Sequence, residues 1–291
     1  GNQTVNIPIT TILEKYDYNI FVVTRGKNIG DPELLSWCLN PITRPDVIVY
    51  REYLPRHVKG PDYITMACIR RSLDIPIVML WTDAERDDII KMEQIYPFVD
   101  KHMLLDCFDP TPFTRTPERY LRMGSPLDRK VVYDDGRERD ISVSFAGKIE
   151  GQGRRIEFIE RIEKEGIPVF ISGGNMDYIT SSEKYFDIYR RSQITLNFVG
   201  RPNTITGRMF EATLCGSLLM EPSHSYHNPF FNEFDDIIPY SNSDELIERI
   251  KFFLVNKIEA RYIATNGRER AKKYFPDWWK TVLGSVGVYH E

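Results

Sequence analysis

Short apolar runs alternate with segments of helical periodicity along the first third of the chain. Four of these runs have the length and the β-branched or aromatic content of buried strands, at 18–26, 46–55, 75–85 and 99–110. Helical patterns lie between them, and one opens with Asp31 as its cap and Pro32 at its first position. Strands that alternate with helices at this spacing predict a parallel sheet with right-handed crossovers.

The alternation stops at 110–140, where proline, glycine and charged residues dominate, and we interpret this stretch as a connection between domains. Further strands are predicted at 141–149, 167–174, 193–200, 217–222 and 236–240, and further helices at 154–166, 182–192, 243–256 and 259–275. Ser243 is the expected cap of its helix. The pattern predicts an α/β protein with two Rossmann-like domains whose parallel sheets face each other across a cleft. A ligand is expected there, beyond the carboxyl ends of the strands.

Composition narrows the class of protein. The 291 residues leave room for two domains, and 42% hydrophobic with 27% charged residues is typical of a globular protein rather than a disordered one. The net charge of −4 gives no reason to expect nucleic acid as a partner. The longest apolar run, "IPIVMLW", is too short to span a bilayer, and no signal peptide is visible, so we expect no transmembrane segment and a cytoplasmic location. Four scattered cysteines, none in a CxxC pair, predict reduced, buried thiols: Cys38, Cys68, Cys107 and Cys215.

Two glycine-containing loops follow predicted strands of the second half. In "SFAGKIEGQGRR", Gly147 and Lys148 precede a helix that begins with Arg154 and Arg155, an arrangement that suits an anion. The spacing matches no established phosphate motif, so a turn with solvated arginines explains it equally well. In "ISGGNMDY", Gly173 and Gly174 stand just past a strand, where a tight turn by itself would account for them.

A third strand end leads through a polar loop into an apolar helix, in "NFVGRPNTITGRMFEATLCGSLLMEP". Arg208 and Glu211 lie three apart and share a face of its first turn. One interpretation is a salt bridge at a helix start. The other is a ligand site in which Arg208 and the helix N-terminus bind a diphosphate and Glu211 accepts hydrogen bonds from ribose hydroxyls. Three such loops at strand ends favour the ligand site. Its remaining candidate residues come from the loop: Asn203, Thr204, Thr206 and Gly207.

Four stretches of the second half, in order, carry a family resemblance: "SFAGK…RR", "YRRSQITLNF", "GRMFEATLCGSLLMEP" and "SDELIERIKFFLVN…GRERAKKYF". They resemble the donor-binding domain of GT-B glycosyltransferases, above all the CgeB-like group and more distantly family-4 and exostosin-like enzymes. Family-4 enzymes carry two glutamates eight apart, and Glu211 matches the second. The first falls on Asn203, a departure that favours the CgeB-like pattern, in which Arg208 accompanies Glu211.

The resemblance implies an acceptor-binding domain at 1–135, a nucleotide-sugar domain at 136–275 and a terminal segment, 276–291, that packs back on the first domain. It implies a sugar nucleotide, with UDP favoured, as donor substrate, a glycan or other hydroxyl acceptor, and no cofactor. Glu52 and Asp83 follow predicted strands of the first half, so either carboxylate is a candidate base for the acceptor hydroxyl. Asp83 is preferred because Trp81 beside it would stack on a sugar, although a helix cap explains Asp83 equally well.

No metal is expected. His224 and His227 lack a third ligand, His102 is isolated, and no DxD motif ends a strand, so transfer should be metal-independent. The alternative function is a non-catalytic nucleotide-sugar-binding or scaffold protein that keeps the donor domain. A Rossmann dehydrogenase is a weaker possibility because no GxGxxG follows any strand.

Overall fold

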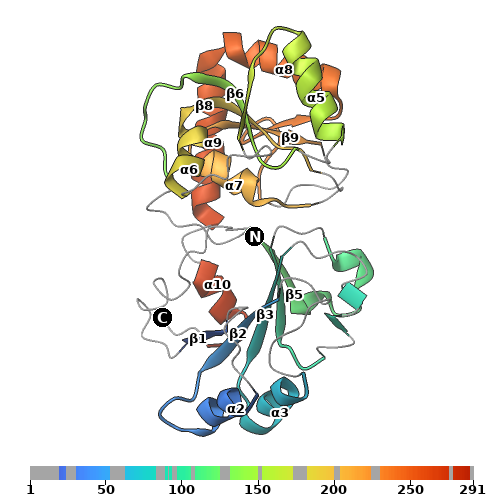
Figure 1. Cartoon of the computed structure of the whole chain (residues 1–291), viewed down its shortest axis with the longest axis vertical. Coiled ribbons are helices and arrows are strands. Elements are labelled where there is room, and N and C mark those ends of the chain that lie inside the picture. The colour runs from blue at the N-terminus through green and yellow to red at the C-terminus, as the bar shows by residue number, and fades with distance from the viewer. Residues whose placement is uncertain are drawn as a thin grey trace. The chain divides into compact units, whose positions relative to one another are not determined.

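The structure, a computed structural model, describes residues 20–23, 31–52, 63–82, 89–90, 92–93, 97–105, 109–124, 132–149, 153–172, 182–199, 204–223, 230–274 and 278–288. The chain divides into two compact units, each described here by itself (Figure 1). Unit 1 takes in Gly1–Ser125 and Asp277–Glu291, and unit 2 takes in Pro126–Pro276.

Unit 1 holds a five-stranded parallel sheet in the order β1-β2-β3-β4-β5. Its strands are β1 (Ile20–Val23), β2 (Val47–Glu52), β3 (Ile77–Thr82), β4 (Lys101–Leu105) and β5 (Tyr120–Met123). Its helices are α2 (Asp31–Leu39), α3 (Tyr63–Leu73) and α10 (Trp278–Gly284), with 3-10 turns at Thr111–Phe113 and Pro117–Arg119. The predicted alternation of strand and helix is therefore confirmed from β1 to β3, whereas the helix predicted between β3 and β4 lies largely outside the described residues.

Strand β5 lies inside the stretch that the sequence analysis assigned to a connection between domains. Residue 110 is therefore too early a start for the connection, because β5 pairs in parallel with β4 and completes the sheet of unit 1. Tyr120 and Met123 are buried on it. Four residues flanked by proline and charge are too few to give a periodic signal, so the strand is recognised only once β4 is there to pair with it.

The apolar core of unit 1 contains a buried hydrogen bond between side chains, from Trp81 to His102. Trp81 is only 1% exposed, and its indole N–H donates a 3.1 Å hydrogen bond to Nδ1 of His102. The His102 ring stacks on Tyr120 at 4.9 Å between centroids. The expectation that Trp81 stacks on a sugar is therefore wrong, because the apolar environment of β3 draws the whole indole into the core. Burial, helped by the charge of Arg119, lowers the pKa of His102 to about 3.

The opposite face of the same sheet packs on the end of the chain. Val282 and Leu283 of α10 are fully buried. They share an apolar cluster with strand residues of unit 1: Val47, Val49, Val78, Leu80, Met103, Leu105 and Met123. The side chains of Trp278 and Trp279 lie outside the described part of the chain.

Unit 2 holds a second five-stranded parallel sheet in the order β10-β9-β8-β6-β7. Its strands are β6 (Ile141–Ala146), β7 (Val169–Ser172), β8 (Ser192–Leu196), β9 (Leu218–Pro222) and β10 (Ile238–Tyr240). Its helices are α5 (Gly153–Lys164), α6 (Ser182–Arg191), α7 (Gly207–Leu214), α8 (Ser243–Val255) and α9 (Lys257–Tyr274). Two parallel sheets in one chain confirm the predicted α/β class with two Rossmann-like units.

Two local expectations are corrected in the described residues. The cap of α8 is Asn242 rather than Ser243, since the Asn242 side chain accepts a 3.0 Å hydrogen bond from the backbone N–H of Glu245. Among the cysteines, Cys38 and Cys215 are buried free thiols, whereas Cys68 is exposed on α3. Its neighbours Met66 and Ile69 occupy the buried face of that helix instead. Cys107 lies outside the described residues.

Candidate functional site

The carboxyl ends of β6, β8 and β9 lie at one edge of the second sheet, because these strands are parallel neighbours. Gly147 follows β6, Asn197 follows β8, and Glu221 lies near the end of β9. Helix α7 begins at the same edge, and its first turn carries Arg208. The topology thus brings Gly147, Asn197, Arg208 and Glu221 to one edge of the sheet.

Arg208 is fixed by two contacts to this edge. Its Nε donates a 2.8 Å hydrogen bond to the carbonyl oxygen of Ala146, and its Nη1 donates a 2.6 Å bond to Oδ1 of Asn197. The guanidinium lies 4.8 Å from the centroid of the Phe145 ring. Arg208 also forms a side-chain hydrogen bond with Tyr189. A guanidinium has five N–H donors, so these bonds leave donors that can bind an anion.

Gly147 permits this position of Arg208. A Cβ at residue 147 would lie 2.5 Å from Nη2 of Arg208 and 3.0 Å from Cζ of Phe145. Any side chain there would displace the guanidinium or the aromatic ring. The glycine that the sequence analysis assigned to anion contact therefore provides room for the arginine.

Asn197 connects Arg208 to a buried carboxylate. Its Nδ2 donates a 2.6 Å hydrogen bond to Oε2 of Glu221 and a 2.9 Å bond to Oγ1 of Thr206. Its backbone carbonyl accepts a bond from the hydroxyl of Tyr240. Asn197 is fully buried and Glu221 is 2% exposed. Because Asn197 accepts from a cation on one side and donates to an anion on the other, the orientation of its amide is fixed.

Glu211 does not pair with Arg208 in the described structure. Its Oε2 accepts hydrogen bonds from the hydroxyls of Tyr185, at 2.8 Å, and Tyr189, at 3.2 Å, both on α6. The two hydroxyls are 2.7 Å apart. The other oxygen, Oε1, has no hydrogen-bond donor among the described residues. The helix-start salt bridge is therefore not formed, and one carboxylate oxygen is held while the other is available.

Burial affects the pKa values of both Glu211 and Arg208. It raises the pKa of Glu211 above its ordinary value, although the hydrogen bond from Tyr185 and the charge of Arg208 oppose the shift. Burial by itself would lower the pKa of Arg208, but nearby Tyr189, Tyr185 and Glu211 outweigh it and the pKa is raised. Burial and the Glu211 charge raise the pKa of both tyrosines, so their hydroxyls stay protonated as donors.

The start of α7 leaves polar groups unpaired. Thr206 is the N-cap, but its side chain does not cap the helix because the hydroxyl accepts from Asn197 instead. The first N–H groups of a helix that lacks a side-chain cap form an anion-binding site. In addition, Oγ1 of Thr204 is buried without a hydrogen-bond partner among the described residues.

A second guanidinium, that of Arg155, lies on the same aromatic ring as Arg208. It lies 5.7 Å from the centroid of the Phe145 ring, which Arg208 also contacts. Burial, and then the charge of Arg208, lower the pKa of Arg155. Lys148 and Arg154 are exposed. Two guanidinium groups on one ring repel each other, so an anion bound here would relieve the repulsion.

Other predicted residues lie outside this cluster or outside the described part of the chain. Gly207 opens α7 beside Arg208. Glu52 ends β2 in unit 1, and its side chain lies outside what the structure describes. Four more predicted positions also lie outside the described residues: Asp83, Gly173, Gly174 and Asn203. Within the described ranges, no group of three His, Cys, Asp or Glu side chains could hold a metal ion.

The sequence analysis missed the residues that hold the Arg208 and Glu211 side chains. Tyr185 and Tyr189 stand four apart on a predicted helix, which is a recognisable signal for one face. Asn197 is the first polar residue after an apolar strand, and Glu221 is a charged residue inside "SLLMEP". Those two signals mark a buried polar pair, although nothing local says that they meet.

Comparison with known proteins places this geometry in a family context. Residues 154–277 match a family model described as "Glycosyl transferase-like". None of the curated proteins matches the sequence. No helix in the described ranges is both long enough and apolar enough to cross a membrane.

Solved structures share the fold over most of the chain. HepE from Anabaena in complex with UDP-glucose has a TM-score of 0.58 at 11% identity, over 88% of this chain and 80% of HepE. A glycosyltransferase from Rickettsia africae has a TM-score of 0.59 at 9% identity, over 89% of this chain and 81% of that one. Sucrose-phosphate synthase from Thermosynechococcus elongatus has a TM-score of 0.53 at 11% identity, over 88% of this chain and 75% of that one. At such identities the likeness shows the fold.

Proposed function

We propose that this chain, which has the GT-B glycosyltransferase fold and a glycosyl transferase-like second unit, transfers a sugar from a nucleoside-diphosphate sugar to a hydroxyl acceptor. The single observation that carries the proposal is the cluster at the start of α7. Arg208 is held with unused N–H groups, and Glu211 is held with an unused carboxylate oxygen one helical turn away.

The two side chains suit two parts of a nucleotide. The free N–H groups of Arg208, the uncapped start of α7 and the nearby Lys148 would bind the diphosphate and stabilise its charge as it leaves. The free oxygen of Glu211 would accept hydrogen bonds from the ribose hydroxyls. The other residues of the proposed donor site are Arg154, Thr204, Thr206, Gly207 and the sequence-predicted positions Gly147, Gly173, Gly174 and Asn203.

UDP is the proposed nucleotide because HepE, which shares the fold, was solved with UDP-glucose. A glycan or another hydroxyl compound is the proposed acceptor, bound by residues of unit 1, with Asp83 or Glu52 as its base. Metal-independent transfer in the cytoplasm, and membership of the CgeB-like group, remain predictions from the sequence.

Isothermal calorimetry with UDP and GDP tests the donor site. Arg208→Gln and Glu211→Gln should each weaken UDP binding about tenfold, a loss of about 1.4 kcal/mol. Arg161→Gln and Glu165→Gln are matched controls, since each removes a similar group from an exposed ion pair, with Asp244 and Lys251 respectively. Wild-type affinity in both site variants would overturn the proposal.

A turnover assay distinguishes a glycosyltransferase from a non-catalytic nucleotide-sugar-binding protein. Release of UDP from UDP-glucose, with or without an added acceptor, is expected of a transferase and should fall in both site variants. A chain that binds UDP but never consumes the donor would instead be a nucleotide-sugar-binding protein.

A further inference from the structure

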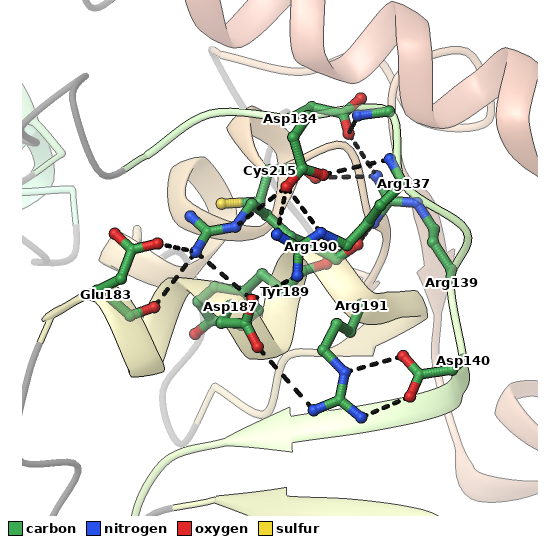
Figure 2. Close-up of polar contacts among 12 residues, drawn as sticks. Asp134, Arg137, Arg139, Asp140, Glu183, Asp187, Tyr189, Arg190, Arg191 and Cys215 are labelled. Carbon is green, nitrogen blue, oxygen red and sulfur yellow. Dashed lines mark hydrogen bonds and ion pairs between the residues drawn. The ribbon is translucent and has the colours of Figure 1, made fainter.

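The segment after the boundary between the units is anchored by one arginine to the ends of two helices. Nη1 of Arg139 donates hydrogen bonds to three carbonyl oxygens where α6 ends, those of Tyr189 at 3.0 Å, Arg190 at 2.9 Å and Ser192 at 2.9 Å. Its Nη2 donates a 2.9 Å bond to the carbonyl of Cys215, the C-cap of α7 (Figure 2). One guanidinium therefore joins the last turns of both helices.

Helices α6 and α7 carry the two residues of the hydrogen bond between Tyr189 and Glu211. Helix α6 carries Tyr189, whose hydroxyl donates to Oε2 of Glu211 while its backbone carbonyl accepts from Arg139. Helix α7 carries Glu211, whose backbone carbonyl accepts a 3.2 Å bond from the N–H of Cys215. Arg139 thus binds the backbone of α6, which carries the Tyr189 hydroxyl. Through the carbonyl of Cys215 it also binds the end of α7, which carries Glu211.

The position of Arg139 is itself fixed. Asp134 accepts a 3.1 Å hydrogen bond from Nη2 of Arg139. The turn after α7 passes directly beside this pair, because a Cβ at Gly216 would lie 2.6 Å from Nη2 and 2.5 Å from Oδ2 of Asp134. Gly216 also has a φ of +74°, which disfavours other residues.

A second arginine ties the same segment to α6. Arg190 is fully buried, lies 4.7 Å from the centroid of the Tyr133 ring, and pairs with Glu183 on its own helix (Figure 2). Its Nε lies 3.9 Å from Oδ2 of Asp135. Arg190 therefore adds further contacts between α6 and the segment that carries Arg139.

We infer that Arg139 is a positioning residue for ribose recognition: it fixes the spacing of α6 and α7 so that Tyr189 holds one oxygen of Glu211 and leaves the other for the ribose. The inference rests on the proposed function, since it concerns the same donor site. Arg139 contacts no part of the nucleotide, and its effect passes through Glu211.

The test compares UDP with 2′,3′-dideoxy-UDP, which lacks the hydroxyls that Glu211 would bind. Calorimetry on the wild type should show a preference for UDP, and Glu211→Gln should remove it. Arg139→Gln should lower UDP affinity about tenfold and leave the dideoxy affinity unchanged. The double variant should lose no more than Glu211→Gln alone, because both changes act on one contact.

Arg161→Gln is the matched control, since its exposed ion pair with Asp244 joins α5 to α8 rather than the segment to α6. It should keep the wild-type preference. Arg139→Lys keeps the charge but not the planar fork of five donors, so it serves as the second variant if Arg139→Gln does not fold. Its preference for UDP should also fall.

Two results overturn the inference while leaving the proposed function intact. One is a full wild-type preference in the folded Arg139 variant. The other is an equal loss for both ligands, which would mean that Arg139 supports the fold in general. A wild type that binds both ligands equally would instead refute the ribose role of Glu211, and the inference with it.

Discussion

The amide of Asn197 accepts a 2.6 Å hydrogen bond from Nη1 of Arg208, although a loop separates the two residues. The same amide donates to the buried carboxylate of Glu221. Here Asn197 lies between the charges, which leaves part of the guanidinium unpaired and able to bind a ligand.

Asn197→Ala should loosen Arg208 and weaken UDP binding about tenfold, since a hydrogen bond to a charged group contributes about 1.5–3 kcal/mol. Calorimetry with UDP measures the effect. The control is Asn266→Ala, which removes an exposed amide bonded to the carbonyl of Asp235. Unchanged affinity in folded Asn197→Ala would show that Arg208 needs no such support.

Gly147→Ala should reduce UDP affinity by displacing the Arg208 guanidinium, which lies 2.5 Å from the new methyl position. A loss of about tenfold is expected, as for removal of the arginine contact itself. Gly153→Ala is a matched glycine control, because its Cβ meets no atom within 4 Å. Equal affinities for the two variants would contradict the close approach.

Acidification should weaken donor binding through Glu211. Burial raises the pKa of its carboxyl above the ordinary 4.5, so protonation begins at a higher pH than for an exposed glutamate. The carboxylate that accepts ribose hydrogen bonds is then lost as the pH falls through this raised pKa. UDP affinity measured from pH 8 to pH 5 should fall more steeply for the wild type than for Glu211→Gln.

The comparison with Glu211→Gln also controls for titration of UDP itself, because its terminal phosphate has a pKa of about 6 and titrates in both measurements. Glu165→Gln, an exposed change, should follow the wild-type curve. Parallel curves for the wild type and Glu211→Gln would mean that the carboxylate takes no part in binding.

The stability of unit 1 should fall in acid because of His102. Its pKa is about 3 in the folded chain against 6.5 for the free side chain, so below pH 6.5 only the unfolded chain takes up the proton. Stability is then lost at up to about 1.4 kcal/mol per pH unit between pH 6.5 and about pH 3. His102→Gln cannot titrate and should flatten this part of the dependence.

Urea unfolding followed by tryptophan fluorescence measures this effect in unit 1, because all four tryptophans belong to that unit. The difference between the wild type and His102→Gln cancels the titration of other groups. A constant difference from pH 7 to pH 4 would show that His102 takes up its proton in the folded chain as readily as in the unfolded chain.

Much of the fold follows from local patterns. Strands β6, β8 and β9 are buried almost throughout, as expected for a parallel sheet covered on both faces, so short apolar runs between helical patterns were enough to predict them. Strand β5 could not, because its four residues fit a sheet only where β4 offers a partner. The hydrogen-bond partner of the buried Trp81 indole is likewise distant in the sequence, since His102 lies 21 residues away.

The candidate site divides in the same way. The sequence by itself determined that Gly147 follows a strand and that Arg208 and Glu211 lie at the start of a helix that follows another strand, because a strand, a glycine or polar loop and a helix in succession form a local signal. Only the tertiary structure decided what holds them. Arg208 binds a carbonyl 62 residues away, and Glu211 binds hydroxyls 26 and 22 residues away. The short-range rule left a direct Arg208–Glu211 pair as one of two interpretations, although the ligand site was favoured. The packing of α6 on α7 instead supplies Glu211 with two hydroxyl donors, and the sheet edge supplies Arg208 with two acceptors. Such partners come together only when the strands have assembled, and no local pattern in the chain records them.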